Sequence, residues 1–485
     1  MKTVNPVVTD QIIEMKRRDF FRNSSLTVAA GSLFSPLDLF GNNNKIIKGS
    51  GTIAKNIIFM VSDGMSTGTL NMASLLLQRK EGRQSHWMQL YLDNKAKRAF
   101  MDTASANSFV TDSAAASSAW GGGVRVNNGS LNANPDGSYN KPILQKFKEA
   151  GKSVGCVTSV PITHATPAGF CINNKSRGDQ NDIALQYLPL KFDVMMGGGQ
   201  DYFDPAKRKD KDNVYKKFDE AGYVTVKTKK ELFNLSASET KPLLGVFADN
   251  ALPFSVDHQH DSTLIEQIPT LAEMTKVAID KLKKNKKGFV IQVEGGKVDW
   301  AAHSNDSAGL LYDQIAFDDA IKVAIDFAEH DKETLVIITT DHGNANPGLF
   351  SGSMTEKNFD YMHHFKHSND WVLNGINKNS TSSQIIERLE EAQGYAIKKA
   401  EAESLLAHYT TLNEEGLYNP KKLPFKELGQ IQSAYTSIGW AGMDHSADYV
   451  ELAMFGPGSE MLKPFVKNTD LHNFMLDATD VRKQS

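Results

Sequence analysis

The sequence predicts an α/β protein with a doubly wound, mostly parallel central sheet and helices on both faces. Apolar segments at 56–62 (NIIFMVS), 287–293 (KGFVIQV) and 334–340 (TLVIITT) are typical of buried strands. They alternate with segments of helical character such as 310–328, and this alternation indicates parallel βαβ units. Each of these strands leads into an acidic residue. Ligand sites of open α/β sheets form at that edge, so the same pattern also locates a candidate site.

The remaining elements follow from the same patterns. Runs rich in β-branched residues between polar turns predict strands, and apolar residues three or four positions apart predict helices. In chain order we expect a helix at 141–150, strands at 153–160 and 192–196, a helix at 268–284, a strand at 449–455 and a terminal helix from about residue 471.

Composition limits the classes of function. The chain has 485 residues, of which 40% are hydrophobic and 23% charged, so it can bury a large core as one big domain or two ordinary ones. A net charge of −3 argues against nucleic acid as a dedicated partner. We expect no transmembrane span in the mature chain. Cys156 and Cys171 are too few for a disulfide framework, and either form one bridge or stay as buried thiols.

The N-terminus predicts export. Residues 16–22 (KRRDFFR) precede a mild apolar run at 24–34, and the two together resemble a twin-arginine signal. We therefore expect residues 1–45 to be an export signal and linker, with Met15 as a plausible start. Residues 46–485 would form the main domain of a periplasmic or extracellular protein. The alternative is a basic, frayed tail.

Residues 344–441 interrupt the alternation of strands and helices. They contain loops rich in Asn, Ser and Gly and one long charged helical run at 382–408. We interpret this stretch as an insertion carried by the core. Its histidines either bind a metal or lie in a solvated loop; they are His363, His364 and His367.

The segment 109–120 (FVTDSAAASSAW) holds a candidate nucleophile. A β-prone run at 108–111 would deliver Ser113 to the first turn of a helix. There the free N–H groups and the helix dipole favour a phosphate or a serine alkoxide. A serine hydroxyl is a poor nucleophile unless a base or a metal activates it, so an activator is expected nearby.

Acidic and imidazole residues at strand ends supply that activator. Asp299 and His303 stand four apart, which places both on one face of a helical turn and suits chelation of a single cation. Oxygen and imidazole ligands without thiolates favour Zn²⁺ together with Mg²⁺. The other candidate ligands lie at or near strand ends: Asp63, Glu294, Asp341, His342 and His445.

Six motifs, in order, closely resemble those of the alkaline phosphatase family. They are VSDGM, TDSAAASSAW, HATPAGF, VEGGKVDWAAHS, TTDHG and DHS, and they span about residues 56 to 456. The resemblance implies a doubly wound α/β core and hydrolysis of small-molecule phosphate monoesters with two zinc ions and one magnesium ion. It also implies that the insertion forms a crown-like cap, which would gate substrate or contact a second subunit in a homodimer.

The resemblance also implies roles for individual residues. Ser113 would form a covalent phosphoserine and touch the second zinc, while Asp112 would orient the phosphate-binding Arg177. The implied ligands are Asp299, His303 and His445 for the first zinc; Asp63, Asp341 and His342 for the second; and Asp63, Thr166 and Glu294 for magnesium.

Two positions depart from the best-known bacterial pattern of the family. His164 stands where that pattern has an aspartate near the magnesium, and Trp300 where it has a lysine near the phosphate. A neutral imidazole in place of a carboxylate should weaken Mg²⁺ binding. We therefore expect a loosely held third metal and weak binding of product phosphate.

Two alternatives stay open. A relative with the same metal ligands could prefer phosphodiesters or sulfate esters, although Ser113 and Arg177 favour monoesters. A non-catalytic protein that sequesters phosphate or metal would keep the ligands but should lose the nucleophile.

Overall fold

The computed structural model describes residues 53–236, 238–411 and 422–481. The export signal predicted at 1–45 lies outside these residues. None of the described helices is both long and apolar enough to cross a membrane.

A ten-stranded sheet forms the centre of the described chain, and its middle strand is the first in sequence. Strand β1 (Asn56–Ser62) pairs in parallel with β7 (Phe289–Gly295) on one side and with β8 (Thr334–Thr339) on the other. All seven residues of β1 are buried. A strand covered on both faces needs a continuous apolar run, which explains the sequence NIIFMVS.

The remaining strands extend the sheet to both sides of β1. Within the described residues, only β13 (Val450–Phe455) runs antiparallel to its neighbours in this sheet. The prediction of a mostly parallel sheet is therefore confirmed. The full order is β14 (Phe465–Lys467), β2 (Lys97–Asp102), β13, β8, β1, β7, β3 (Ser153–Pro161), β4 (Val194–Gly198), β6 (Leu243–Val246) and β5 (Val224–Val226).

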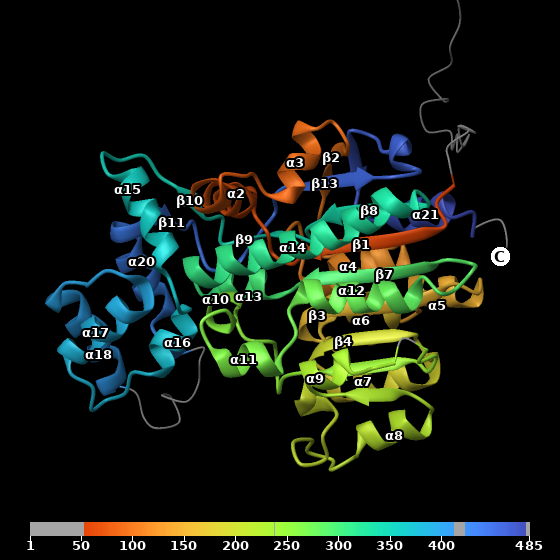
Figure 1. The fold of residues 1–485 in the computed structure, drawn as a ribbon, viewed down its shortest axis with the longest axis horizontal. Helices are drawn as coiled ribbons and strands as arrows, with labels where there is room; N and C mark the ends of the chain where they lie inside the picture. The colour runs from red at the N-terminus through yellow and green to blue at the C-terminus, as the bar shows by residue number, and fades with distance from the viewer. Residues whose placement is uncertain (1–52, 237, 412–421, 482–485) are drawn as a thin grey trace, which may run out of the picture. The chain divides into compact units, whose positions relative to one another are not determined.

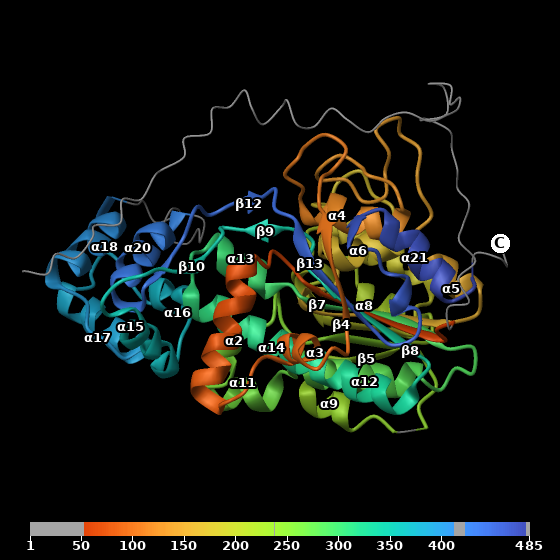
Figure 2. The same ribbon diagram turned by 90° about the horizontal axis from the view of Figure 1, so that it is seen from above.

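Helices cover both faces of the sheet, as predicted (Figure 2). Alternate side chains of β1 enter two different cores: Ile57 and Phe59 pack on one side, Ile58 and Met60 on the other. The first face carries α4 (Ser113–Gly122), α5 (Ile143–Glu149), α6 (Ala165–Cys171), α7 (Gln180–Tyr187), α8 (Val214–Glu220) and α21 (Asp470–Ala478). The second carries α2 (Thr67–Glu81), α3 (His86–Leu92), α9 (Lys229–Phe233), α10 (Ser255–His258), α12 (Leu271–Leu282) and α14 (Ser307–Asp331).

The segment between β8 and β13 forms a cluster of helices at one end of the sheet (Figure 1). Two short antiparallel ladders join it to the core, namely β9 (Gly343–Asn344) with β12 (His445–Ser446), and β10 (Gly348–Leu349) with β11 (Ile438–Gly439). Its helices are α15 (Thr355–Asp360), α16 (Asn369–Asn374), α17 (Ser382–Gln393), α18 (Lys399–Thr411) and α20 (Phe425–Thr436).

Two predicted elements are wrong in detail. The single helical run at 382–408 is broken at Gly394, which has a left-handed φ of 77° and donates its N–H to Glu390 O, so it ends α17 as a C-cap. The strand expected at 108–111 is a loop, because β2 ends at Asp102. Ser113 still begins a helix, since the Asp112 carboxylate caps α4 by accepting from Ala115 N at 3.0 Å.

The two cysteines are free thiols in the core beneath α6. Cys156 in β3 and Cys171 at the end of α6 are both buried, and their sulfurs lie 3.5 Å apart.

The close crossing of α4 and α6 predicts a destabilising substitution. A Cβ atom at Gly121 would overlap the carbonyl oxygen of Gly169, which is backbone and cannot rotate away. Gly121→Ala should therefore lower the free energy of unfolding by about 1–3 kcal/mol. It should also reduce kcat, because α4 carries Ser113. Thermal unfolding and turnover measure both effects. Gly352→Ala is the matched control, since no atom lies within 3.5 Å of its added Cβ; equal melting temperatures for the two variants would contradict the prediction.

Candidate active site

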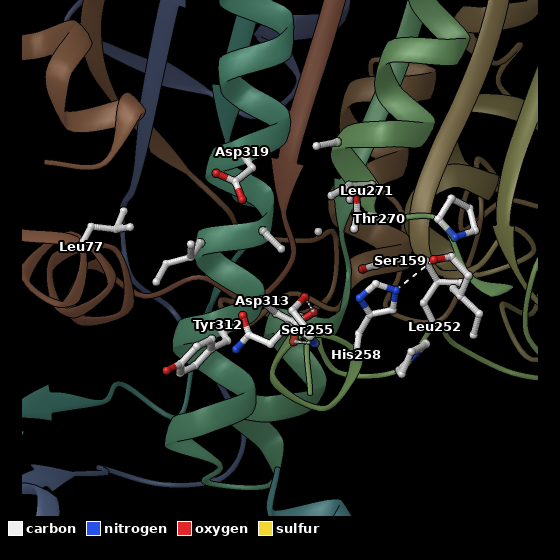
Figure 3. A pocket seen from close by; sticks show the side chains of 18 of the residues that line it. Leu77, Ser159, Leu252, Ser255, His258, Thr270, Leu271, Tyr312, Asp313 and Asp319 are labelled. Atoms are coloured by element: carbon white, nitrogen blue, oxygen red, sulfur yellow. Dashed lines mark hydrogen bonds between the residues drawn. The ribbon is translucent and has the colours of Figure 1, made fainter. Parts of the chain in front are cut away.

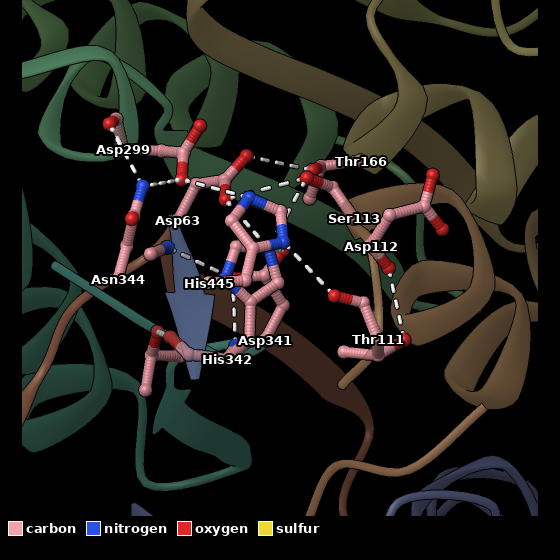
Figure 4. A network of polar contacts seen from close by, with 12 residues as sticks. Asp63, Thr111, Asp112, Ser113, Thr166, Asp299, Asp341, His342, Asn344 and His445 are labelled. Atoms are coloured by element: carbon pink, nitrogen blue, oxygen red, sulfur yellow. Dashed lines mark hydrogen bonds and ion pairs between the residues drawn. The ribbon is translucent and has the colours of Figure 1, made fainter. Parts of the chain in front are cut away.

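The carboxyl ends of three adjacent strands bring acidic side chains together at one edge of the sheet. Asp63 follows β1, Glu294 lies near the end of β7, and Asp341 follows β8. All three side chains are buried. Because β1 lies between β7 and β8, the order of the strands alone makes these carboxylates neighbours. Figure 4 shows Asp63 and Asp341 among the polar contacts built around them.

Among the described residues, three groups of carboxylates and imidazoles have ligand atoms within 4.8 Å of one another. We name each group after one member. They are the Asp341 group (Asp63, Asp341, His342), the Asp299 group (Asp299, His303, His445) and the Glu294 group (Asp63, His164, Glu294).

The Asp341 group surrounds the candidate nucleophile. His342 Nε2 lies 3.2 Å from Asp341 Oδ2 and 3.5 Å from Asp63 Oδ1. Ser113 Oγ lies 3.3 Å from His342 Nε2 and 3.5 Å from Asp63 Oδ1. The side chain of Ser113 thus points from the start of α4 into the same set of ligand atoms. A cation held by this group would touch the hydroxyl that it has to activate.

The Asp299 group is built on a short helix, α13 (Lys297–His303). Asp299 and His303 share one face, as their spacing predicts, with His303 Nε2 3.5 Å from Asp299 Oδ2. The Nε2 atoms of His303 and His445 lie 3.0 Å apart. The Nδ1 atom of His303 faces the backbone carbonyl of Met443 at 2.6 Å, and the Nδ1 atom of His445 faces that of Thr111 at 2.9 Å. Protons on Nδ1 leave both Nε2 lone pairs facing each other, which a shared cation would satisfy.

The Glu294 group lies between β7 and the start of α6. His164 Nδ1 is 3.6 Å from Glu294 Oε1, and Thr166 Oγ1 donates to Asp63 Oδ2 at 3.2 Å. The second oxygen of Glu294 accepts from Thr158 Oγ1 at 2.5 Å. Asp63 belongs to this group and to the Asp341 group, so two cations could share its carboxylate.

The charges and unpaired atoms of these groups fit bound metal ions. Three ligand atoms have no hydrogen-bond partner in the described chain: Asp341 Oδ2, Glu294 Oε1 and His164 Nδ1. Leaving a buried polar atom unpaired costs about 1–3 kcal/mol. Burial raises the pKa of Asp63 well above its ordinary value, and the nearby carboxylates of Asp341, Asp299 and Glu294 raise it further. A bound cation would relieve both penalties.

The histidines respond differently to this environment. Burial opposes the charged form of His445, but its hydrogen bond and proximity to Asp299 prevail and raise its pKa to about 9. Burial also opposes ionisation of Asp299; the bond from His445 and the charges of the three surrounding histidines outweigh it and lower the pKa of Asp299. Burial lowers the pKa of His342. Without a cation, the Asp299 group therefore holds a proton that a metal would have to displace.

Arg177 is held by contacts with Asp112 and His164. Its Nη1 donates to Asp112 Oδ2 at 3.0 Å, and its Nη2 lies 3.0 Å from His164 Nε2. The other oxygen of Asp112 caps α4, so this carboxylate fixes the guanidinium relative to the helix that carries Ser113. The ring of Trp300 meets that of His164 edge-on, with centroids 6.3 Å apart.

A cleft of about 1,610 Å³ opens onto these residues and is lined by Ser113, Arg177, Asp299 and Trp300 among others. A second cavity, of about 250 Å³, lies between α12 and α14 (Figure 3). Its main polar groups are already paired: Asp313 accepts from Ser255 N at 2.9 Å, and His258 Nε2 lies 2.9 Å from Ile268 O. The large cleft, and not the smaller cavity, is therefore the candidate catalytic site.

The structure adds a residue that sequence reasoning missed. Buried Asn344 donates to Asp299 Oδ1 at 2.7 Å and holds this candidate ligand in place. The only indication in the sequence was that Asn344 directly follows the motif TTDHG, which contains candidate metal ligands. None of the three histidines predicted in the insertion belongs to the groups above. His364 is exposed, whereas His367 is half-buried, pairs with Asp257 at 3.1 Å and stacks on the Trp371 ring with centroids 3.9 Å apart.

A serine held among buried carboxylates and imidazoles at this edge of a doubly wound sheet is typical of metal-dependent hydrolases. The chain belongs to the alkaline phosphatase family, whose model, described as alkaline phosphatase, matches residues 54–481. Its activity is accordingly that of an alkaline phosphatase, a hydrolase of phosphate monoesters.

Relatives agree with this assignment. Alkaline phosphatase 4 of Bacillus subtilis is 32% identical over 429 residues, covering 87% of this chain and 88% of the relative. The crystal structure of Thermus thermophilus alkaline phosphatase is similar with a TM-score of 0.82 and 31% identity, covering 93% of this chain and 96% of that one. A cold-active alkaline phosphatase from Shewanella sp. is similar with a TM-score of 0.72 and 25% identity, and the match covers 87% of this chain and 99% of that one.

Proposed function

We propose that this alkaline phosphatase acts through a covalent phosphoserine at Ser113, with two zinc ions and one magnesium ion. The observation that carries the proposal is the position of Ser113 Oγ. It lies within 3.5 Å of both Asp63 and His342, in a cleft that also contains the anchored guanidinium of Arg177. The candidate nucleophile, the candidate metal ligands and the guanidinium of Arg177, which would bind the phosphate, therefore lie in the same cleft.

The donor sets suggest how the ions are distributed. The Asp299 and Asp341 groups combine carboxylates with imidazoles, which suits zinc. Asp63, Thr166 and Glu294 offer oxygen atoms, which suit magnesium. When bound, the ions would lower the pKa of the Ser113 hydroxyl and stabilise negative charge on the leaving oxygen.

The residues of the chain account for the remaining steps. Arg177 binds two non-bridging oxygens of the phosphate and aligns the phosphorus with Ser113. Ser113 Oγ loses its proton to solvent and forms a bond to phosphorus as the bond to the leaving oxygen breaks, and that oxygen takes up a proton from solvent to leave as the alcohol. Water then attacks the phosphoserine, which releases inorganic phosphate and restores the serine. The N-terminus of α4 favours the negative charge near Ser113 in both steps.

Hydrolysis of p-nitrophenyl phosphate against bis(p-nitrophenyl) phosphate tests the proposal, run with and without added Zn²⁺ and Mg²⁺. We expect a strong preference for the monoester, loss of turnover with a chelator, and a labelled phosphoserine after acid quenching. A preference for the diester would favour a phosphodiesterase, and a fully metal-loaded enzyme without turnover would favour a sequestering protein.

Two further parts of the proposal concern the rest of the chain. Residues 1–45 would direct export to the periplasm or the medium, which N-terminal sequencing of the mature protein tests. The insertion at 344–441 would act as a cap over the cleft or as a homodimer contact, which the mass of the protein in solution distinguishes.

His164→Asp is expected to tighten binding of the third metal. His164 Nδ1 has no hydrogen-bond partner and lies 3.6 Å from Glu294 Oε1, so a carboxylate there would add an anionic ligand beside Glu294. We expect roughly tenfold lower Mg²⁺ concentrations for half-maximal activation, a shift of about 1.4 kcal/mol in binding free energy. Metal content after dialysis provides an independent readout. Unchanged magnesium retention and activation would contradict the prediction.

Trp300→Lys is expected to tighten binding of product phosphate. The indole lines the cleft beside His164, which contacts Arg177, so an ammonium at this position would add positive charge near the phosphate. Through a bridging water, the change should lower the inhibition constant of inorganic phosphate by roughly fivefold. Trp300→Gln serves as the control, since it removes the ring without adding charge. Equal inhibition constants for the two variants would show that the indole only packs beneath the site.

A further inference from the structure

The insertion contributes to the same cleft as the catalytic serine. Residues 422–427 and Gln430, at the beginning of α20, line the cleft together with Ser113 and Arg177. We call this surface the outer wall. At about 1,610 Å³ the cleft is far larger than a phosphate group needs, so the outer wall is positioned to contact the remainder of the substrate.

The outer wall carries two ammonium groups that have no partner among the described residues. Lys422 and Lys426 are exposed, and within the described residues neither ammonium forms an ion pair or a hydrogen bond. Other lysines of the insertion do form ion pairs, as Lys399 does with Glu403 at 3.5 Å. The one carboxylate of the wall, Glu427, already accepts a hydrogen bond from Ser404. The two lysines therefore present positive charge to the cleft.

The acidic residues elsewhere in the cleft have other neighbours. Asp112 is bound by Arg177. Asp370 lies near the buried ammonium of Lys297, which sits 3.4 Å from the centroid of the Phe254 ring. Asp444 directly precedes the candidate metal ligand His445 and lines the cleft beside it. Among the described residues, the outer wall therefore carries two lysines against one carboxylate, Glu427, and keeps a net positive charge.

We propose that Lys422 and Lys426 form a second anion subsite, which recognises an additional phosphate group on the leaving alcohol. Preferred substrates are then bisphosphates, in which one phosphate reacts at Ser113 while the other contacts the outer wall. The inference rests on the proposed function and names the substrate class of the same site. Two ammonium groups at the edge of a partly enclosed cleft attract an anion and lose that attraction as salt screens them.

Fructose 1,6-bisphosphate and fructose 6-phosphate provide a matched pair of substrates, since the second phosphate distinguishes them. We expect the wild-type enzyme to show a higher kcat/KM for the bisphosphate, through a lower KM. In Lys422→Met/Lys426→Met, the ratio of the two kcat/KM values should fall by about fivefold to tenfold, consistent with two partly exposed charge contacts. About 0.5 M sodium chloride should reduce the wild-type ratio in the same direction.

Lys357→Met/Lys366→Met is the control. Both residues are exposed lysines of the insertion outside the cleft, and the variant changes net charge by the same amount. It should leave the ratio unchanged. An unchanged ratio in the outer-wall variant, or an equal fall in both variants, would overturn the subsite. Failure of the wild-type enzyme to hydrolyse either sugar phosphate or p-nitrophenyl phosphate would instead overturn the proposed function.

Discussion

Ser113→Ala is expected to lower kcat for p-nitrophenyl phosphate by a factor on the order of 10⁴ or more, because it removes the hydroxyl that forms the proposed covalent intermediate. The hydroxyl contacts only site residues, Asp63 at 3.5 Å and His342 at 3.3 Å. Alanine is also a good residue for the first turn of α4, so the fold should persist. Turnover measures the loss of kcat, and labelling of the acid-quenched enzyme measures the loss of the covalent intermediate. The melting temperature shows whether the fold persists.

Ser118→Ala is the matched control for this experiment. Ser118 lies on the same helix and is equally buried, but its hydroxyl bonds to backbone, with Ala114 O at 2.7 Å. We expect it to cost some stability and to keep most of the turnover. If Ser113→Ala retained activity within tenfold of the wild type, the phosphoserine would be excluded as an obligatory intermediate.

The central sheet and the positions of the ligands were predictable for one physical reason. Strands buried on both faces need continuous apolar runs, and these are easy to recognise in the sequence. Asp63, Glu294 and Asp341 each stand within a residue or two of the end of such a run. Once the strands are assigned as parallel neighbours, the carboxylates must meet. The i, i+4 spacing predicted the shared face of Asp299 and His303 in the same local way.

Features that depend on tertiary contacts were not predictable in this way. The loop before Ser113 reads as β-prone, yet it pairs with no strand of the described sheets. The hydrogen bond from Asn344 to Asp299 joins residues 45 positions apart. Lys422 and Lys426 look like ordinary surface lysines until the insertion is seen to line the cleft. Only Gly394, which ends α17, could have been found locally, since glycine is the usual C-cap of a helix.

Removal of the metals is expected to abolish turnover and to lower the melting temperature by an amount that grows with pH. In the metal-free protein the pKa of His445 rises to about 9, because its bond and charge interaction with Asp299 outweigh burial. A raised pKa of this kind stabilises the fold below about pH 6.5, the ordinary histidine value, and the stabilisation is lost as pH approaches 9. The loss is at most roughly 3 kcal/mol.

Asp63 also makes the metal-free fold less stable as pH rises. Burial and neighbouring carboxylates raise its pKa, so the folded metal-free protein favours the protonated acid and is penalised as that acid ionises. Metal ions bind the deprotonated ligands and remove both effects. The difference in melting temperature between metal-loaded and metal-free protein should therefore widen from pH 6.5 to 9. Calorimetry on samples of measured zinc and magnesium content checks this.

Metal-loaded Ser113→Ala separates metal binding from catalysis in this experiment. The carboxylates and imidazoles of the three groups are intact in this variant, so it should keep most of the metal-dependent rise in melting temperature although it does not turn over. If chelation shifted the melting temperature equally at pH 6.5 and 9, protons would not compete with metal at Asp63 and His445. The buried carboxylates would then need another source of compensation, because burying a charge without a partner costs free energy.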